Sequence, residues 1–144
     1  MKVEINYVGS TEEEGAVINT VSLTEELKGA IDILENNCRV IPVTKDGENV
    51  LCHIDRIYYI ESIDKRTYIY TKDGCFETKY RLYELEEILS RNFLRIAKAM
   101  ILNLKKIRSV KAEINGRLTA ELLNGEKVLI ARSYVKELKE RLGI

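Results

Sequence analysis

The sequence predicts an α+β fold, mainly β, in which antiparallel strands and two short helices follow a small N-terminal unit of two strands and a helix. Three observations support this prediction. Apolar and polar residues alternate along much of the chain, which is the period of a half-buried strand. Asp-Gly or Asn-Gly dipeptides, a strong signal for a β-hairpin, occur four times between these alternations. Two later segments instead carry leucine and isoleucine at helical spacing.

The N-terminal unit is expected to span residues 1–36, ahead of a body over residues 37–144. Alternation predicts one strand over residues 3–7 and a second, shorter one over residues 16–18. Ser22 and Glu25 form a capping box at the start of a helix. The apolar stripe of that helix consists of Leu27, Ala30, Ile31 and Leu34. Because the unit is too small to bury this stripe, we expect it to pack on the body or on a second copy.

Short alternations bounded by turn signals predict nine strands in the body: Val40–Thr44, Val50–His53, Ile57–Ser62, Tyr68–Thr71, Cys75–Lys79, Leu94–Ala97, Val110–Ile114, Leu118–Leu122 and Val128–Ile130. The four dipeptides predict type I′ turns, with positive φ at both central residues: Asp46-Gly47, Asp73-Gly74, Asn115-Gly116 and Asn124-Gly125. Apolar stripes predict helices around Leu82–Ser90 and over Ser133–Leu142. Pro42 lacks a backbone N–H, which predicts an edge position for the first strand of the body.

The formal net charge of zero is a cancellation along the chain. Residues 1–36 hold 2 basic and 8 acidic side chains, residues 37–90 have a balance of −2, and residues 91–144 hold 13 basic and 5 acidic ones. Such asymmetry indicates a surface for a polyanion.

Cysteine usage indicates a reducing compartment. Cys38, Cys52 and Cys75 contain no C-x-x-C pair, so they predict neither a disulfide framework nor a zinc site, and we expect them to be buried. The sequence shows no signal peptide and no apolar run of membrane-spanning length, which predicts a soluble, cytoplasmic protein.

Enzymatic chemistry has no support in the sequence. No phosphate-binding glycine loop, H-E-x-x-H or G-x-S-x-G motif is present, and His53 is the only histidine. We read His53 as structural, and Glu61 and Asp64 as loop charges. The sequence therefore predicts no enzyme, no catalytic residue, no metal site, no cofactor and no small-molecule substrate.

Basic side chains instead concentrate where strands end or connect, interleaved with amide and hydroxyl groups. Lysine and arginine neutralise phosphates, and arginine, asparagine, serine and threonine also read base edges. The candidate DNA-binding residues are Lys65, Arg66, Thr67, Arg95, Lys98, Asn103, Lys105, Lys106, Arg132 and Ser133.

The order of these pieces resembles the LytTR family of bacterial DNA-binding domains, from about Arg39 to the C-terminus. The resemblance lies in five segments in order: Ile57–Ser62, the Leu82–Leu89 helix, Phe93–Ile96 leading to Ile101–Ile107, Asn124-Gly125, and Ile130–Leu138.

The resemblance implies an elongated body of small antiparallel sheets whose loops enter successive major grooves of DNA at paired repeats. Base contacts would then fall at or beside Arg66 and Thr67, at Lys98, and at Arg132 and Ser133. This chain departs from the family at Ala97-Lys98-Ala99, where a histidine and a serine are common, and at Ala131, where a serine is common. The target sequence of other members therefore does not carry over.

The length of the N-terminal unit points to the short family members that have no receiver domain, which another protein regulates, in some cases a small membrane protein. We expect a homodimeric, sequence-specific transcriptional regulator of promoter DNA, with residues 1–36 serving dimerisation or partner docking. The alternative is a protein–protein interaction module of the same fold, which the Ala97 and Ala99 departures favour. A small-molecule-binding β-domain is a third interpretation, without a polar pocket signature behind it.

Overall fold

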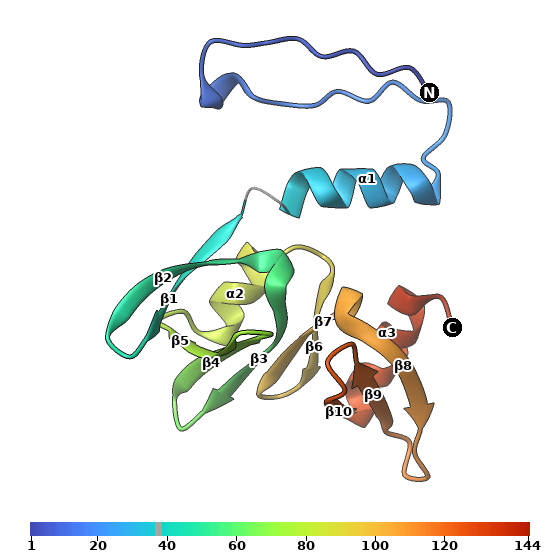
Figure 1. Ribbon diagram of the computed structural model, residues 1–144. Helices are drawn as coiled ribbons and strands as arrows, with labels where there is room; N and C mark the ends of the chain where they lie inside the picture. The colour runs from blue at the N-terminus through green and yellow to red at the C-terminus, as the bar shows by residue number, and fades with distance from the viewer. Residues whose placement is uncertain (37–38) are drawn as a thin grey trace.

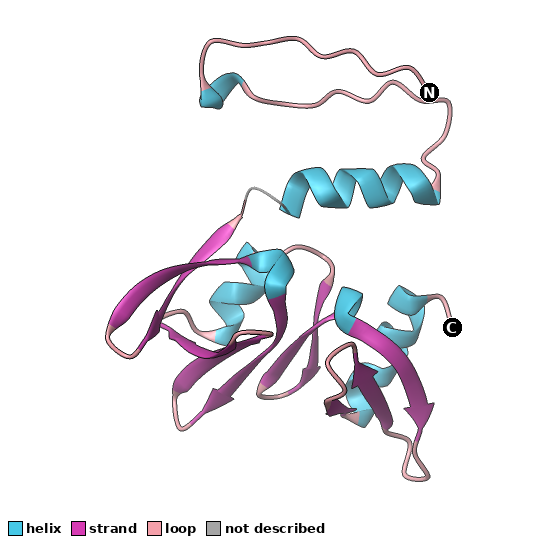
Figure 2. Ribbon diagram, viewed as in Figure 1, coloured by secondary structure: helices cyan, strands magenta, loops and turns pink. Residues whose placement is uncertain are grey.

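The computed structural model describes residues 1–36 and 39–144, and it folds residues 40–142 into two antiparallel sheets with a helix packed on each (Figures 1 and 2). The strands are β1 (Val40–Lys45), β2 (Glu48–His53), β3 (Ile57–Ile63), β4 (Arg66–Thr71), β5 (Gly74–Thr78), β6 (Phe93–Ala97), β7 (Met100–Asn103), β8 (Ile107–Ala112), β9 (Leu118–Leu122) and β10 (Lys127–Ile130). The α-helices are α1 (Glu25–Asn36), α2 (Leu82–Ile88) and α3 (Arg132–Leu142), and 3-10 turns lie at η1 (Thr11–Glu13), η2 (Ile54–Arg56) and η3 (Leu104–Lys106). The predicted mainly β, α+β fold is confirmed.

The larger sheet has seven strands in the order β2-β1-β5-β4-β3-β7-β6, and the smaller has three in the order β10-β9-β8. Each adjacent pair is antiparallel. The two sheets lie next to each other, with α2 near the first and α3 near the second, which makes the body elongated (Figure 1).

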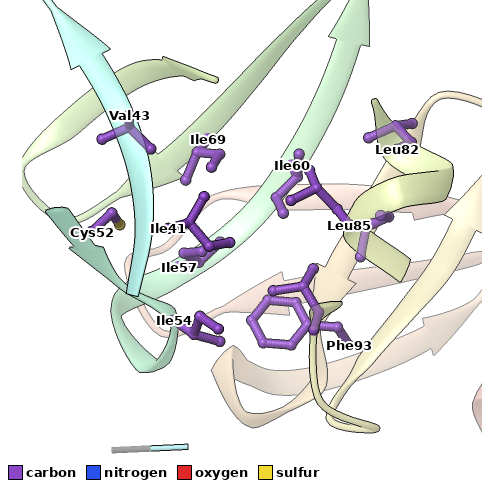
Figure 3. Packing of buried hydrophobic residues seen from close by; sticks show 12 residues of the cluster. Ile41, Val43, Cys52, Ile54, Ile57, Ile60, Ile69, Leu82, Leu85 and Phe93 are labelled. Atoms are coloured by element: carbon purple, nitrogen blue, oxygen red, sulfur yellow. The ribbon is translucent and has the colours of Figure 1, made fainter. Parts of the chain in front are cut away.

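Alternation along β3, β6 and β7 sends side chains to two separate cores. On one face, Ile57, Ile60 and Ile101 join α2 and the β1–β2 hairpin in a cluster whose members include Ile41, Ile54, Ile69 and Leu85 (Figure 3). On the other face, Leu94, Ile96 and Leu102 pack against the small sheet and α3, through residues such as Leu122, Ile130 and Leu138. The two cores hold the connections at the ends of these three strands in fixed relative positions.

The N-terminal unit differs from its prediction. Residues 3–7 and 16–18 are extended but do not form strands, so both strand predictions are wrong. The predicted helix is present as α1, but Thr24 caps it in place of Ser22, since Leu27 N–H donates to Thr24 Oγ1 at 3.2 Å. Leu27 is buried whereas Leu34 is 54% exposed, so only part of the apolar stripe is covered.

The structure differs from the sequence-based predictions for the turns and for Pro42. All four dipeptides join antiparallel strands, but only Asp46-Gly47 has positive φ at both residues. Pro42 does not lie in an edge strand, because β1 sits between β2 and β5. Its carbonyl faces β5 and accepts a hydrogen bond from Thr78 Oγ1 at 3.2 Å, and the β1–β5 ladder is reduced to the pair Thr44 and Glu77. The missing N–H of proline therefore costs no ladder bond.

The body contains one strand that the sequence analysis did not predict, β7, and β8 begins three residues earlier than predicted. Cys52 is buried as expected, Cys75 is exposed against expectation, and Cys38 lies outside the described residues. Among the described residues, no group of histidine, cysteine and carboxylate side chains could hold a metal ion. In the same part of the chain, no helix is long and apolar enough to cross a membrane.

Candidate nucleic-acid interface

Three connections that are distant in sequence meet at one edge of the molecule. The β3–β4 turn, the β6–β7 turn and the start of α3 are joined in pairs by backbone hydrogen bonds. Ser62 N–H, near the end of β3, donates to Ala99 O in the β6–β7 turn at 2.8 Å. Ala131 N–H, just before α3, donates to Ile96 O of β6 at 2.9 Å. Each connection carries predicted DNA-binding residues, so the fold brings these parts of the candidate set together.

The β3–β4 connection is a tight turn of two residues. Asp64 and Lys65 have φ of 49° and 65°, and Ile63 pairs with Arg66 across the turn. A non-glycine residue at positive φ is uncommon, and here the Arg81 guanidinium supports the turn by donating to Lys65 O at 3.2 Å. Lys65 and Arg66 are exposed at the tip. Thr67 is only 3% exposed, so it serves the sheet and we leave it out of the candidate surface.

The Arg95 side chain stabilises the β6–β7 turn through hydrogen bonds to its backbone carbonyls. Its Nε donates to Ala97 O and Lys98 O, both at 3.2 Å, and its Nη2 donates to Lys98 O at 2.6 Å. Its Nη1 pairs with Glu86 of α2. All three guanidinium nitrogens are therefore engaged within the protein. Arg95 positions the turn, while Lys98 stands exposed at its tip.

The third connection is the first turn of α3. Arg132 and Ser133 are both exposed, and the helix has no acidic side chain in this turn. The positive end of the helix dipole and its free N–H groups therefore add to the charge of Arg132. The Arg132 stem lies across Gly116 in the β8–β9 turn, where an added Cβ would be 3.3 Å from Arg132 Cδ.

The β8–β9 turn also belongs to this surface, although its residues are not among those predicted from the sequence. Figure 1 shows its tip projecting in the same general direction as the β3–β4 and β6–β7 turns. Asn115 and Arg117 are exposed there, beside the fully exposed Ile114. The Asn115-Gly116 dipeptide predicts only a turn, and no feature of the sequence links it to Arg132.

Three predicted residues lie at the far end of β7 from the Lys98 turn. Asn103 is 2% exposed: its Nδ2 donates to Ile57 O at 2.8 Å, and its Oδ1 accepts from Lys105 N–H at 3.1 Å. Lys106 Nζ lies 5.0 Å from the centre of the Tyr58 ring, and Lys105 is exposed on η3. The fold does not bring these residues to the candidate edge, and Asn103 has a structural role.

The exposed cations of the edge are Lys65, Arg66, Lys98, Arg117 and Arg132. Over the described ranges 1–36 and 39–144, only Arg66 of these five takes part in an ion pair, with its Nε 4.0 Å from Glu77 Oε1. Cationic tips on a rigid sheet edge, with asparagine and serine between them, match the backbone and base edges of nucleic acid. Fold and edge together define a β-rich domain of the kind that binds nucleic acid through its connections.

Comparisons with known proteins specify the class further. The sequence pattern of the LytTr DNA-binding domain matches residues 47–143. A protein of Staphylococcus aureus (strain bovine RF122 / ET3-1), named as an HTH-type transcriptional regulator, is 35% identical over 99 residues, which are 69% of this chain and 67% of that one. A protein of the same description from strain NCTC 8325 / PS 47 is 33% identical with the same coverage. The chain therefore belongs to the LytTR family and carries a LytTr DNA-binding domain, a class of regulator domain and not of enzyme.

A solved LytTr DNA-binding domain from Bacillus cereus shares the fold, with a TM-score of 0.70 and 24% identity over 73% of this chain and 97% of that domain. The term HTH in the names of the relatives does not describe this fold. Within residues 39–144, α2 and α3 are separated by five strands, so no two consecutive helices form a helix-turn-helix.

Proposed function

We propose that this protein is a transcriptional regulator that binds specific double-stranded promoter sites through the edge formed by the β3–β4 turn, the β6–β7 turn and the start of α3. The observation that carries the proposal is the pair of backbone hydrogen bonds, Ser62 N to Ala99 O and Ala131 N to Ile96 O, that align these three connections.

Each tip has a role that follows from its chemistry. Lys65 and Arg66 stand on a turn that Arg81 supports, and they neutralise phosphates and present one guanidinium fork. Lys98 is a single ammonium on a turn fixed by Arg95, which suits contact with the N7 and O6 acceptors of guanine. Arg132 can make a bidentate contact with the same acceptors, and Ser133 and the free N–H groups of α3 can bind an adjacent phosphate.

We further propose that two copies occupy repeated half-sites. One edge offers few base contacts, and each good bidentate contact contributes about 1–3 kcal/mol of discrimination. A second copy that binds a second half-site multiplies the specificity of the first copy, although it makes the same contacts. A regulatory membrane protein remains a proposed partner that the full chain could bind away from this edge.

Fluorescence anisotropy with a duplex from the region upstream of the chain's own operon tests the function. We expect Lys98→Ala and Arg132→Ala each to weaken binding by about 1–3 kcal/mol and to relax specificity at one base position. Lys139→Ala, on the exposed face of α3, is the matched control and should change little. For the parent, affinity should fall steeply with salt as counterions are released.

Two results would count against the proposal. Equal losses on specific and random duplexes for all three variants would mean nonspecific attraction to phosphates. Binding to neither duplex would favour an interaction module of the same fold, an alternative consistent with the small residues Ala97 and Ala99 on either side of Lys98.

A further inference from the structure

For its length, the N-terminal unit exposes far more large apolar side chains than the body. Of the large apolar side chains that are exposed in the described residues, ten lie within residues 1–36 and eight within the much longer stretch 39–144. Ile5 is 73% exposed, Tyr7 96% and Val17 89%. A concentration of this kind on a small segment is typical of an interaction site.

The backbone of this segment is also unsatisfied. Residues 2–9 and 15–24, which we call the two arms, are extended and run side by side, joined at η1 (Figure 1). Within the described residues 2–9 and 15–23, no backbone–backbone hydrogen bond is formed, and the bond from Glu13 N–H to Ser10 O, at 3.2 Å, lies in the connecting turn. Extended arms with alternating apolar side chains and free N–H and C=O groups offer a template for pairing with another strand.

The charges of the N-terminal unit favour a second copy of this chain as the partner of the arms. The first arm carries Lys2 and Glu4, and the second arm carries no charged residue, so the arms are neutral. The other acidic side chains of the N-terminal unit lie outside the arms, at Glu12–Glu14 and on α1. A two-fold pairing of antiparallel arms places the two glutamate-rich tips at opposite ends, so like charges do not meet. A basic partner would find no carboxylate on the arms other than Glu4.

We propose that the arms of two copies pair with each other about a two-fold axis and form the dimer interface of this protein. Such an isologous interface needs only one self-complementary surface. The arms, together with exposed Ile33 and Leu34 of α1, approach the roughly 20–30 residues per partner of a stable interface.

The interface leaves the DNA-binding edge free. α1 is tied to the body by Asp32, whose Oδ1 lies 3.9 Å from Arg91 Nε, in the connection that precedes β6. That connection is at the opposite end of β6 from the Lys98 turn. A dimer joined through the arms therefore presents two such edges, and only this consequence rests on the proposed function.

The test uses the full chain under reducing conditions. Sedimentation equilibrium between about 1 and 100 µM, a range that brackets micromolar affinity, should show a dimer for the parent. Ile5→Asp/Val17→Asp should raise the dissociation constant at least ~100-fold, because each aspartate would be buried in the interface without a partner. The control Leu51→Asp/Tyr83→Asp alters side chains that are 67% and 68% exposed on the body, and its dissociation constant should stay within about threefold of the parent value.

Amide hydrogen exchange gives a second readout. Amides of the arms should be protected in the parent and exchange freely in the arm variant, while thermal unfolding of the body is unchanged. A monomeric parent at 100 µM, or an arm variant that dimerises like the parent, would overturn the inference. If the arms behave as expected and no form binds the upstream duplex, the proposed function fails and the interface stands.

Discussion

The substitution Asn103→Ala tests whether Asn103 stabilises the fold or contacts DNA. The amide of Asn103 holds two backbone groups together: Ile57 O, in a fully buried residue, and the N–H of Lys105 in η3. Leaving a buried carbonyl without a partner costs about 1–3 kcal/mol. Losing the cap on η3 costs about 1 kcal/mol more. We expect the variant to lose about 2–4 kcal/mol of unfolding free energy, which lowers Tm by about 6–12 °C for a chain of this size.

Urea unfolding followed by circular dichroism measures this change, with an unchanged m-value showing that the transition stays the same. Asn124→Ala is the matched control, because Asn124 Oδ1 also accepts from the N–H two residues later, at 3.0 Å, but in an exposed turn. The control should lose less than about 1 kcal/mol. A variant Asn103→Ala as stable as the parent, or one that stays folded yet loses sequence-specific DNA binding, would refute the structural role.

Two further predictions concern the edge and the tyrosines. Gly116→Ala places a Cβ 3.3 Å from Arg132 Cδ at a φ of +81°, and Gly125→Ala has a similar φ of +87° in open space. Both should lose about 1–2 kcal/mol of stability, but in anisotropy only Gly116→Ala should weaken DNA binding; equal binding by both would contradict the contact with Arg132. Burial raises the pKa of Tyr59 and of Tyr70. The carboxylate of Glu126 raises the pKa of Tyr59 further, and that of Glu61 does the same for Tyr70. Unfolded tyrosine ionises near pH 10, so the unfolding free energy should fall as pH rises above about 10, and Tyr70→Phe should flatten this fall; parallel urea midpoints for both proteins from pH 9 to 11 would contradict it.

The strands of the body could be predicted because their signals are local. Alternation and the glycine-containing turns gave nine of the ten strands described in residues 39–144. β7 was missed because its turn, Lys98-Ala99, has no glycine and neither residue has positive φ. The register of the β6–β7 pair shifts between Arg95 and Ala97, just before this turn, which further interrupts the alternation of the two strands.

The N-terminal arms show the opposite case. Their alternation has the period of a strand, but a strand also needs a neighbour to pair with, and the described chain does not supply one. Periodicity therefore described the side chains of residues 3–7 correctly and the hydrogen bonding incorrectly. Asn103 was predicted to bind DNA because its amide lies among cations in the sequence. Its burial, which depends on the fold, shows that it serves the structure instead.

Four of the five edge cations were predicted individually, but Arg117 and the assembly of the edge were not, because long-range contacts such as the bond from Ser62 N to Ala99 O create the edge. The same arrangement explains how a chain of zero net charge can bind a polyanion. The acidic α1 contacts Arg91 at one end of β6, and the Lys98 turn lies at the other end, five residues along the strand. At about 3.3 Å per residue this separation is about 16 Å, roughly twice the Debye length of about 8 Å at physiological ionic strength. DNA at the proposed edge would therefore meet the local cations, and the carboxylates of α1 would be largely screened from it.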